Sequence, residues 1–266
     1  MLRGVVFTGV YYALSVVYVL AALPCLLWPT RGPAAFVIRS YARAIRWALW
    51  LIAGVRTEAR GKERLPDGPF IVAAKHQSWG DGFMTYPEVQ NLAFVTGDHL
   101  EKFPLVGGIL RKLGAIVIDT CGGGARKAAS LAEGMATARA EGRRVLIYPE
   151  GHLAAVDHKF RYKPGVWHMY KAMNAPVVPV ATNLGVFWAQ EEMKKTPGQA
   201  CIEFLEPIEP GLDKDAFLAR LEAAVEGRTA ELVAEARGRA PVEAVLLPDP
   251  DKGALAGPAA AATAEA

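Results

Sequence analysis

The chain has 266 residues, of which 52% are hydrophobic and 21% are charged, and its mean hydropathy is +0.16. This composition excludes a disordered polyelectrolyte and is sufficient for one large domain with a substantial core. Residues 1–62 carry eight basic side chains and one acidic one, whereas the other 204 residues carry 22 basic and 26 acidic side chains. A basic, apolar N-terminus favours contact with an anionic membrane surface over contact with nucleic acid.

The first predicted element is a membrane helix. No charged residue occurs from Gly4 to Trp28, and these 25 residues would form a helix of roughly 37 Å, longer than the ~30 Å hydrocarbon core of a bilayer. A cleavable signal peptide is the alternative interpretation. Its apolar region would normally be only about 7–15 residues long, and no suitable cleavage site follows.

The second predicted element is an interfacial or shallow membrane helix from Ala35 to Val55. Three arginines share one face and two tryptophans favour the headgroup level, namely Arg39, Arg43, Arg46, Trp47 and Trp50. An ordinary core helix with outward arginines is the alternative. Since the basic residues follow the apolar run, the positive-inside rule predicts that residues from 31 onward face the cytoplasm. We therefore expect residues 1–60 to form membrane-spanning or interfacial helices at the inner, cytoplasmic membrane.

From Gly61 onward, short apolar runs alternate with helical patterns. Strands are predicted at Phe70–Ala74, Leu92–Val95, Ala115–Ile118, Arg144–Tyr148, Val177–Thr182 and Cys201–Leu205. Helices are predicted at Phe103–Leu113, Ala125–Glu141, Gly165–Asn174 and Asp215–Ala236. This alternation predicts a single α/β domain over residues 61–239, with a mainly parallel sheet flanked by helices. Residues 240–266 are rich in Ala, Pro and Gly and are predicted to be a disordered tail.

The strongest candidate for chemistry follows the first strand of this domain. His76 and Asp81 are five residues apart, and they would not meet on a regular helix. They can meet if His76 ends the strand and Gly80 lets the chain turn into a helix at Asp81. A carboxylate on one imidazole nitrogen fixes the tautomer, so the other nitrogen can accept a proton as a general base.

Two later segments also carry unusual residues at strand ends. The strand before Tyr148 runs into Pro149, Glu150 and Gly151, which places a carboxylate and a flexible turn where α/β sheets commonly bind ligands. The strand at Val177–Thr182 contains Pro179, and a proline there predicts an edge position or a functional break.

In this order and spacing, the segments resemble the four sequence blocks of the glycerolipid acyltransferase family, which includes the 1-acylglycerol-3-phosphate acyltransferases. The matched blocks are His76–Asp81, then His99–Gly107 with Pro104 and Gly107 retained, then Tyr148–Gly151, then Val178–Val180 around Pro179. The N-terminal membrane element is similar to that of the family as well. Trp79, within the first block, is a candidate for shaping a pocket beside the base.

The resemblance implies the transfer of a fatty acyl chain from acyl-CoA or acyl-carrier protein to the free hydroxyl of a lysolipid in the membrane. His76 would take the hydroxyl proton and Asp81 would orient His76, with no metal and no other cofactor. The resemblance favours 1-acylglycerol-3-phosphate as the acceptor of this chain, which would give phosphatidic acid. Two other classes remain as alternatives: a non-catalytic lipid-binding relative, and a thioesterase-like hydrolase in which His76 activates water.

The acceptor blocks depart from the family pattern. His152 and Leu153 stand where the third block usually continues with Thr-Arg, and that arginine is usually credited with holding the acceptor phosphate. Losing one charge-assisted contact costs about 1.5–3 kcal/mol. Either nearby groups take over the acceptor, or the acceptor has no phosphomonoester, as in a lyso-ornithine lipid or another lysophospholipid. The candidate acceptor-binding residues are Glu150, Gly151, His152, Arg126, Lys159, Arg161 and Lys163.

Overall fold

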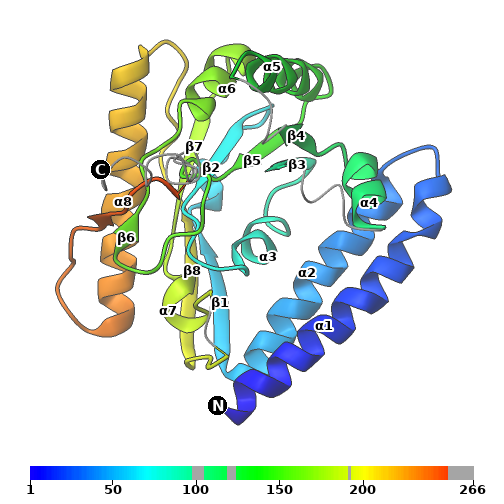
Figure 1. The fold of residues 1–266 in the computed structure, drawn as a ribbon, viewed down its shortest axis with the longest axis vertical. Coiled ribbons are helices and arrows are strands. Elements are labelled where there is room, and N and C mark those ends of the chain that lie inside the picture. Colours follow the sequence, from blue (N-terminus) through cyan, green and yellow to red (C-terminus); the bar gives the residue numbers. More distant parts are fainter. Residues whose placement is uncertain (98–104, 119–123, 191–192, 251–266) are drawn as a thin grey trace, which may run out of the picture.

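The computed structural model describes residues 1–97, 105–118, 124–190 and 193–250, without the side chains of residues 124–128. Within these ranges, helices cover both faces of a mainly parallel sheet, which confirms the predicted α/β class (Figure 1). The strands are β1 (Val55–Arg60), β2 (Ile71–Ala74), β3 (Leu92–Gly97), β4 (Ile116–Ile118), β5 (Arg144–Ile147), β6 (His158–Lys159), β7 (Val177–Thr182), β8 (Gly198–Phe204) and β9 (Val245–Leu246). The α-helices are α1 (Leu2–Ala22), α2 (Gly32–Ala53), α3 (Asp81–Thr85), α4 (Val106–Leu113), α5 (Gly124–Ala140), α6 (Gly165–Met173), α7 (Leu184–Phe187) and α8 (Lys214–Arg237). Two short 3-10 helices, η1 (Pro24–Leu27) and η2 (Lys62–Arg64), follow α1 and β1.

The main sheet has the strand order β1-β8-β7-β2-β5-β3-β4. Neighbouring strands are parallel except for the antiparallel pair β7 and β8. Ala73 of β2 pairs with Ile147 of β5, so the residues that follow these two strands emerge beside each other at one edge of the sheet. Ligands commonly bind at this carboxyl-terminal edge in parallel sheets.

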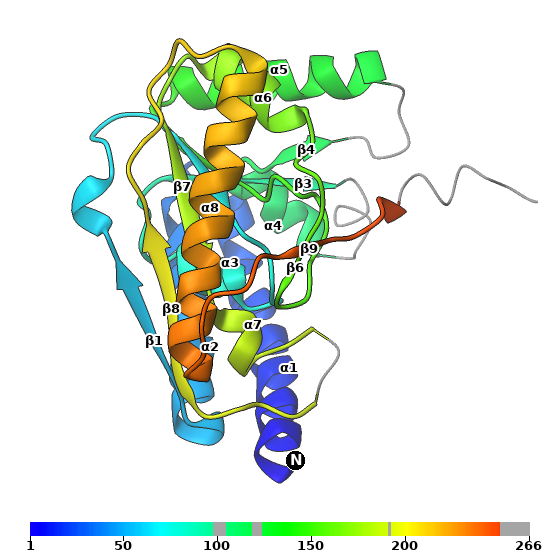
Figure 2. The same cartoon turned by 90° about the vertical axis from the view of Figure 1, so that its left-hand side faces the viewer.

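Alternate side chains of the central strands enter two separate hydrophobic layers. Val72 and Ala74 face the layer formed with α1, α2, α3 and α7. Ile71 and Ala73 face the layer formed with α5, α6 and α8. Figure 2 shows α8 running along one face of the sheet, with α1 and α2 on the far side. Burial on both faces accounts for the continuous apolar sequence of β2 and β7.

The N-terminal helices α1 and α2 form an antiparallel hairpin against the sheet (Figure 1). The Ser15 and Tyr41 hydroxyls hydrogen-bond across the hairpin at 2.6 Å, and Phe7 is buried in the layer beneath it. The second helix ends at Gly54, whose φ of 73° is the left-handed conformation that favours glycine at a helix C-terminus. Together α1 and η1 are long and apolar enough to cross a membrane.

The sheet begins earlier in the chain than the sequence pattern predicts. Residues 55–60 form β1, although they were expected to belong with the N-terminal helices. This strand lies at the edge of the sheet, pairs only with β8, and carries the charged residues Arg56, Glu58 and Arg60. Charged edge strands lack the apolar alternation by which strands are recognised.

Pro179 does not mark an edge strand, because β7 lies between β2 and β8. The β7–β8 ladder covers Val180 to Thr182, and the next contact is the bridge between Val177 and Ile208. Pro179 lies between these two stretches, where its carbonyl accepts a hydrogen bond from the Leu205 amide. The missing N–H therefore falls at a break in the ladder with β8, and the ladder with β2 is unaffected.

Part of the predicted tail is ordered. Val245 and Leu246 form β9, which pairs in parallel with β6. Arg237 and Arg239 both bind Asp157, at 2.6 and 2.5 Å, and this fixes the chain before it reaches β9. Backbone hydrogen bonds can hold such a segment without an apolar sequence pattern. Residues 251–266 lie outside the described part of the chain.

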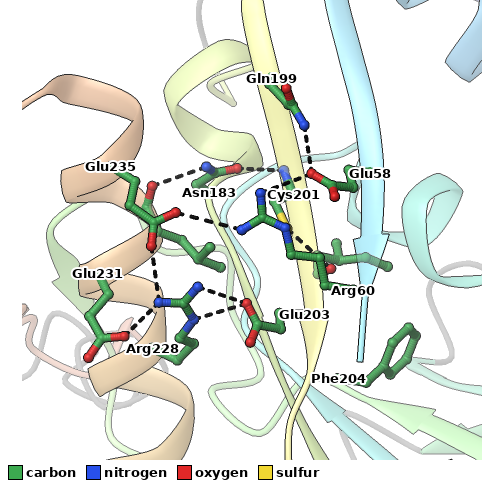
Figure 3. A network of polar contacts seen from close by, with 12 residues as sticks. Glu58, Arg60, Asn183, Gln199, Cys201, Glu203, Phe204, Arg228, Glu231 and Glu235 are labelled. Carbon is green, nitrogen blue, oxygen red and sulfur yellow. Dashed lines mark hydrogen bonds and ion pairs between the residues drawn. The ribbon is translucent and has the colours of Figure 1, made fainter. Parts of the chain in front are cut away.

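Ionic contacts join α8 to the edge of the sheet (Figure 3). Arg228 of α8 lies 2.9 Å from Glu203 of β8 and 3.1 Å from Glu235 on its own helix. Arg60 of β1 is 3.7 Å from Glu235 and 3.0 Å from Glu58. The acidic partners hold the pKa of Arg228 above its usual value despite its partial burial. The network ties β1, β8 and α8 into one unit.

Candidate active site

His76 and Asp81 meet at the carboxyl-terminal edge of the sheet, as predicted. His76 Nδ1 is 2.8 Å from Asp81 Oδ2. The same carboxylate oxygen accepts hydrogen bonds from the backbone amides of Gln77 and Ser78, each at 2.8 Å. Three donors therefore converge on one buried oxygen and hold it in place. Since that oxygen accepts, Nδ1 carries the imidazole hydrogen and Nε2 is left as a proton acceptor.

The chain turns between His76 and Asp81 as predicted, but Gly80 is needed there for a different reason than backbone flexibility. Gly80 has a φ of −79° and a ψ of −13°, which any residue can adopt. A glycine is needed at this position because there is no space for a side chain. A Cβ atom there would lie 2.6 Å from the Trp188 ring and 2.8 Å from Leu184. Gly80 therefore allows close packing of the turn before α3 against α7.

Tyr148 covers one face of the His76 imidazole. The rings of His76 and Tyr148 are stacked, with centroids 3.9 Å apart and an angle of 14° between planes. Burial and the charge of Asp81 raise the pKa of Tyr148 far above its usual value, so its hydroxyl remains neutral. The His76 side chain keeps 24% of its surface exposed. In the described part of the chain Nε2 contacts no polar group, so it is open to a substrate hydroxyl.

Glu150 lies behind the imidazole, within the protein. Its side chain is 1% exposed, and its Oε2 accepts hydrogen bonds from the Phe160 amide at 2.7 Å and from Lys75 Nζ at 3.1 Å. Lys75 directly precedes His76 and is itself fully buried. In this arrangement the carboxylate supports the end of β2 and does not reach the exposed edge where an acceptor would bind.

The ionic cluster around Lys75 includes a second carboxylate. Lys75 Nζ lies 3.0 Å from both oxygens of Glu226 on α8, and Tyr162 donates a hydrogen bond to Glu226 at 3.0 Å. One buried cation thus faces two carboxylates. Burial raises the pKa of Glu150 to about 7; Lys75 opposes this rise and Glu226 adds to it. A shared proton would make the cluster electrically neutral.

His152, which stands at the first of the two positions where the family has Thr-Arg, lies beside Lys163 and Gly151. Lys163 Nζ is 3.0 Å from His152 Nε2, and the Lys163 amide donates to the Pro149 carbonyl at 2.8 Å. Gly151 has a φ of 71°, and a Cβ atom there would lie 3.0 Å from the Lys163 side chain. The loop continues to Ala154, whose amide donates to the His76 carbonyl at 2.9 Å. These backbone hydrogen bonds tie the loop that carries His152 and Lys163 to the end of β2, where His76 lies.

The other candidate cations are placed differently. Lys159 forms an ion pair with Glu222 at 2.9 Å, which raises the pKa of its ammonium. Arg161 is exposed, and among the described residues no side chain pairs with it. The side chain of Arg126 lies outside the described part of the chain.

The remaining motif residues are placed as follows. Trp79 is 52% exposed beside the catalytic pair in sequence, and Gly107 is buried in α4. Pro149 follows β5 and Pro179 lies within β7. Pro104 lies outside the described residues, as do His99 and most of the second block.

Two sets of long-range contacts beside His76 and Asp81 have no signal in the sequence. Lys75 and Glu226 are 151 residues apart, so no local pattern could link them. Phe83 of α3 packs edge-on against Tyr41 of the hairpin at 5.1 Å and against Tyr11 at 6.0 Å. The helix that carries Asp81 therefore rests directly on the N-terminal hairpin.

Comparisons with known proteins concern the fold and the family. The family model named Acyltransferase matches residues 56–183, the range that contains His76, Asp81 and the third and fourth blocks. This match supports a place in the glycerolipid acyltransferase family. The chain is an O-acyltransferase. A Pseudomonas aeruginosa protein named 1-acyl-sn-glycerol-3-phosphate acyltransferase is 27% identical over 78% of this chain and 80% of its own length.

A yeast protein and a solved structure are also similar to this chain. A Saccharomyces cerevisiae protein of the same name is 26% identical over 65% of this chain and 60% of its own length. The crystal structure of the 1-acyl-sn-glycerophosphate acyltransferase PlsC from Thermotoga maritima has a TM-score of 0.73. It covers 88% of this chain and 97% of its own at 21% identity, and thus supports the fold of this acyltransferase.

Proposed function

We propose that this acyltransferase moves a fatty acyl group from acyl-CoA or acyl-carrier protein to the free hydroxyl of 1-acylglycerol-3-phosphate, giving phosphatidic acid. The observation that carries the proposal is the His76–Asp81 hydrogen bond of 2.8 Å, with Nε2 open at the sheet edge. The names of the bacterial and yeast relatives support the acceptor.

The mechanism follows from the two imidazole nitrogens. As the acceptor oxygen attacks the thioester carbonyl, His76 Nε2 removes the hydroxyl proton and Asp81 stabilises the resulting imidazolium. The C–S bond then breaks, and the imidazolium returns the proton to the leaving thiolate. General-base assistance of this kind contributes roughly 10²–10⁴-fold to the rate. No side-chain nucleophile is needed.

The acceptor phosphate would bind at Lys163 and His152. Both side chains lie on the loop that joins β5 to α6, and this loop is hydrogen-bonded to the His76 backbone. A phosphomonoester next to an ammonium gains a charge-assisted hydrogen bond of about 1.5–3 kcal/mol. Lys163 would thus supply the positive charge that the family's arginine supplies elsewhere.

The hairpin would attach the enzyme to the cytoplasmic face of the inner membrane without spanning it. Seven residues on the outer face of α1 are exposed and apolar or aromatic, namely Leu2, Val5, Val6, Tyr12, Val16, Val17 and Leu20. However, α1 packs along α2, and α2 is bound to the α/β domain by Arg39 with Gln90 and by Arg46 with Glu88. A spanning α1 would pull these arginines toward the hydrocarbon at a cost of several kcal/mol. An in-plane hairpin leaves them at the domain surface.

An acceptor panel tests the proposal. Vesicles containing the enzyme and one acyl thioester are supplied with lysophosphatidic acid, lyso-ornithine lipid or lysophosphatidylcholine. Lysophosphatidic acid should be the best acceptor, and Lys163→Met should raise its KM by roughly tenfold or more. Lys159→Met is the matched control, because Glu222 already pairs with that ammonium. Preference for an acceptor without a phosphomonoester would refute the assigned acceptor, and release of free fatty acid alone would indicate a hydrolase.

A further inference from the structure

A second basic site lies outside the active site, in a groove between the C-terminal half of α2 and β1. The groove has a volume of about 480 Å³ and is lined by Arg43, Arg46, Trp47, Trp50, Arg56 and Thr57. Half of these residues are arginines, and none is acidic. The three guanidinium groups suit an anion, and the rings of Trp47 and Trp50 pack edge-on against each other beside them.

Two of the three arginines are available to a ligand. Arg46 is held by Glu88 at 2.6 Å and by the Thr57 hydroxyl at 2.9 Å. Arg43 and Arg56 are exposed, and no carboxylate of the described residues lies within ion-pair distance of either. The Arg56 guanidinium lies over the Trp50 ring at 5.9 Å, which orients it toward the groove. Guanidinium groups prefer to pair with phosphate in a bidentate geometry.

The rim of the groove has the composition of a membrane interface. Trp47, Trp50 and Leu51 are 58%, 39% and 68% exposed, beside the arginines on α2. The hairpin is antiparallel, so the N-terminal end of α1 lies near the C-terminal end of α2 (Figure 1). Val5 and Val6, in the first turns of α1, are exposed. Tryptophan rings favour the headgroup level, and basic residues beside them attract anionic lipids.

We propose that this groove binds the phosphate of an anionic phospholipid in the bilayer surface. The inference rests on the membrane association contained in the proposed function, but it concerns a site separate from His76 and from Lys163. Arg43 and Arg56 bind the phosphate, and Trp47 and Trp50 enter the headgroup layer beside it. Such a lipid would fix how deep the hairpin sits and at what angle the active site faces the bilayer.

Vesicle partitioning of the full chain tests the site. The probes are vesicles of phosphatidylcholine alone and of phosphatidylcholine with phosphatidylglycerol. We compare the wild type with Arg43→Gln/Arg56→Gln and with the control Lys214→Gln/Arg220→Gln, which removes the same charge from exposed positions on α8. Each groove arginine should contribute about fivefold to binding, so the groove variant should lose roughly 25-fold on the anionic vesicles. On neutral vesicles it should match the wild type.

Three results would overturn the site. The first is that Arg43→Gln/Arg56→Gln binds anionic vesicles as strongly as the wild type does. The second is an equal loss in the α8 control, which would show a general effect of net charge. The third is specific displacement by inorganic phosphate relative to chloride of equal ionic strength, which would identify a free-phosphate site in place of a lipid site. Activity in neutral detergent micelles reports separately on the proposed function, and Arg43→Gln/Arg56→Gln should retain it.

Discussion

Replacing Lys75 by methionine should be among the most damaging single changes that leave the catalytic pair itself intact. The Lys75 side chain is fully buried, and its ammonium is the cation that faces Glu150 and Glu226 in the cluster behind His76. Methionine keeps the approximate length of the side chain but removes the charge. Two buried carboxylates would then face each other without compensation.

The size of the effect follows from this burial. Removing one partner of a buried ion pair costs about 3–5 kcal/mol, whereas an exposed pair contributes about 0–1 kcal/mol. Protonation of both carboxylates would limit the loss at low pH, so the deficit should grow as pH rises. Because Lys75 Nζ also donates to the His158 carbonyl and Lys75 directly precedes His76, kcat should fall along with stability.

Urea denaturation and acyl-transfer kinetics would measure both effects. Lys62→Met is the matched control, because Lys62 is half exposed and pairs with Glu88 at 3.0 Å. The double variant Lys75→Met/Glu150→Gln should lose less than the sum of the single variants by about 1–3 kcal/mol. A Lys75→Met loss no larger than that of Lys62→Met would refute the reasoning, because the cluster would then contribute no more than a surface pair.

Three further predictions concern other contacts. Gly80→Ala places a methyl group 2.6 Å from Trp188 and should cost about 1–3 kcal/mol of unfolding free energy, seen as a lower Tm. The pKa of Glu150 is about 7 in the folded protein, above 4.5, so the folded state binds more protons between these values and the unfolding free energy falls as pH rises through this window. Glu150→Gln should remove that fall, by up to about 3 kcal/mol, in urea denaturation from pH 4.5 to pH 7. Asp249 lies 3.9 Å from Lys163, so Asp249→Asn should lower the KM for lysophosphatidic acid about twofold, the range expected for a part-exposed pair, and an increase in KM would contradict this.

The elements that could be predicted are those whose own sequence shows an apolar run or a helical periodicity. The six strands and four helices that were predicted carry apolar runs or helical periodicity, and all six strands are present within a few residues of their expected bounds. The strand β1 has no such signal, since its charged side chains line a sheet edge. The strand β9 is held by backbone pairing and by two arginines on Asp157, which composition cannot show.

The contact between His76 and Asp81 was predictable because both residues lie within one short turn. Its supports were not, because they come from distant parts of the chain. Tyr148 stands in the third block, yet only the parallel pairing of β2 with β5 brings its ring onto His76. Glu150 was expected at the acceptor, and its buried contact with Lys75 could be seen only once the layers were assembled. The role of Gly80 depends in the same way on Trp188.

The central claim is that His76 Nε2 is the general base for acyl transfer to a lysolipid hydroxyl. The most direct test is a single-turnover measurement of acyl transfer to lysophosphatidic acid by His76→Ala, with His168→Ala as the matched control on the exposed face of α6. His76→Ala should be slower by roughly 10²–10⁴-fold, with unchanged vesicle binding and folding, and His168→Ala should match the wild type. Acyl transfer by His76→Ala at the wild-type rate would contradict the mechanism.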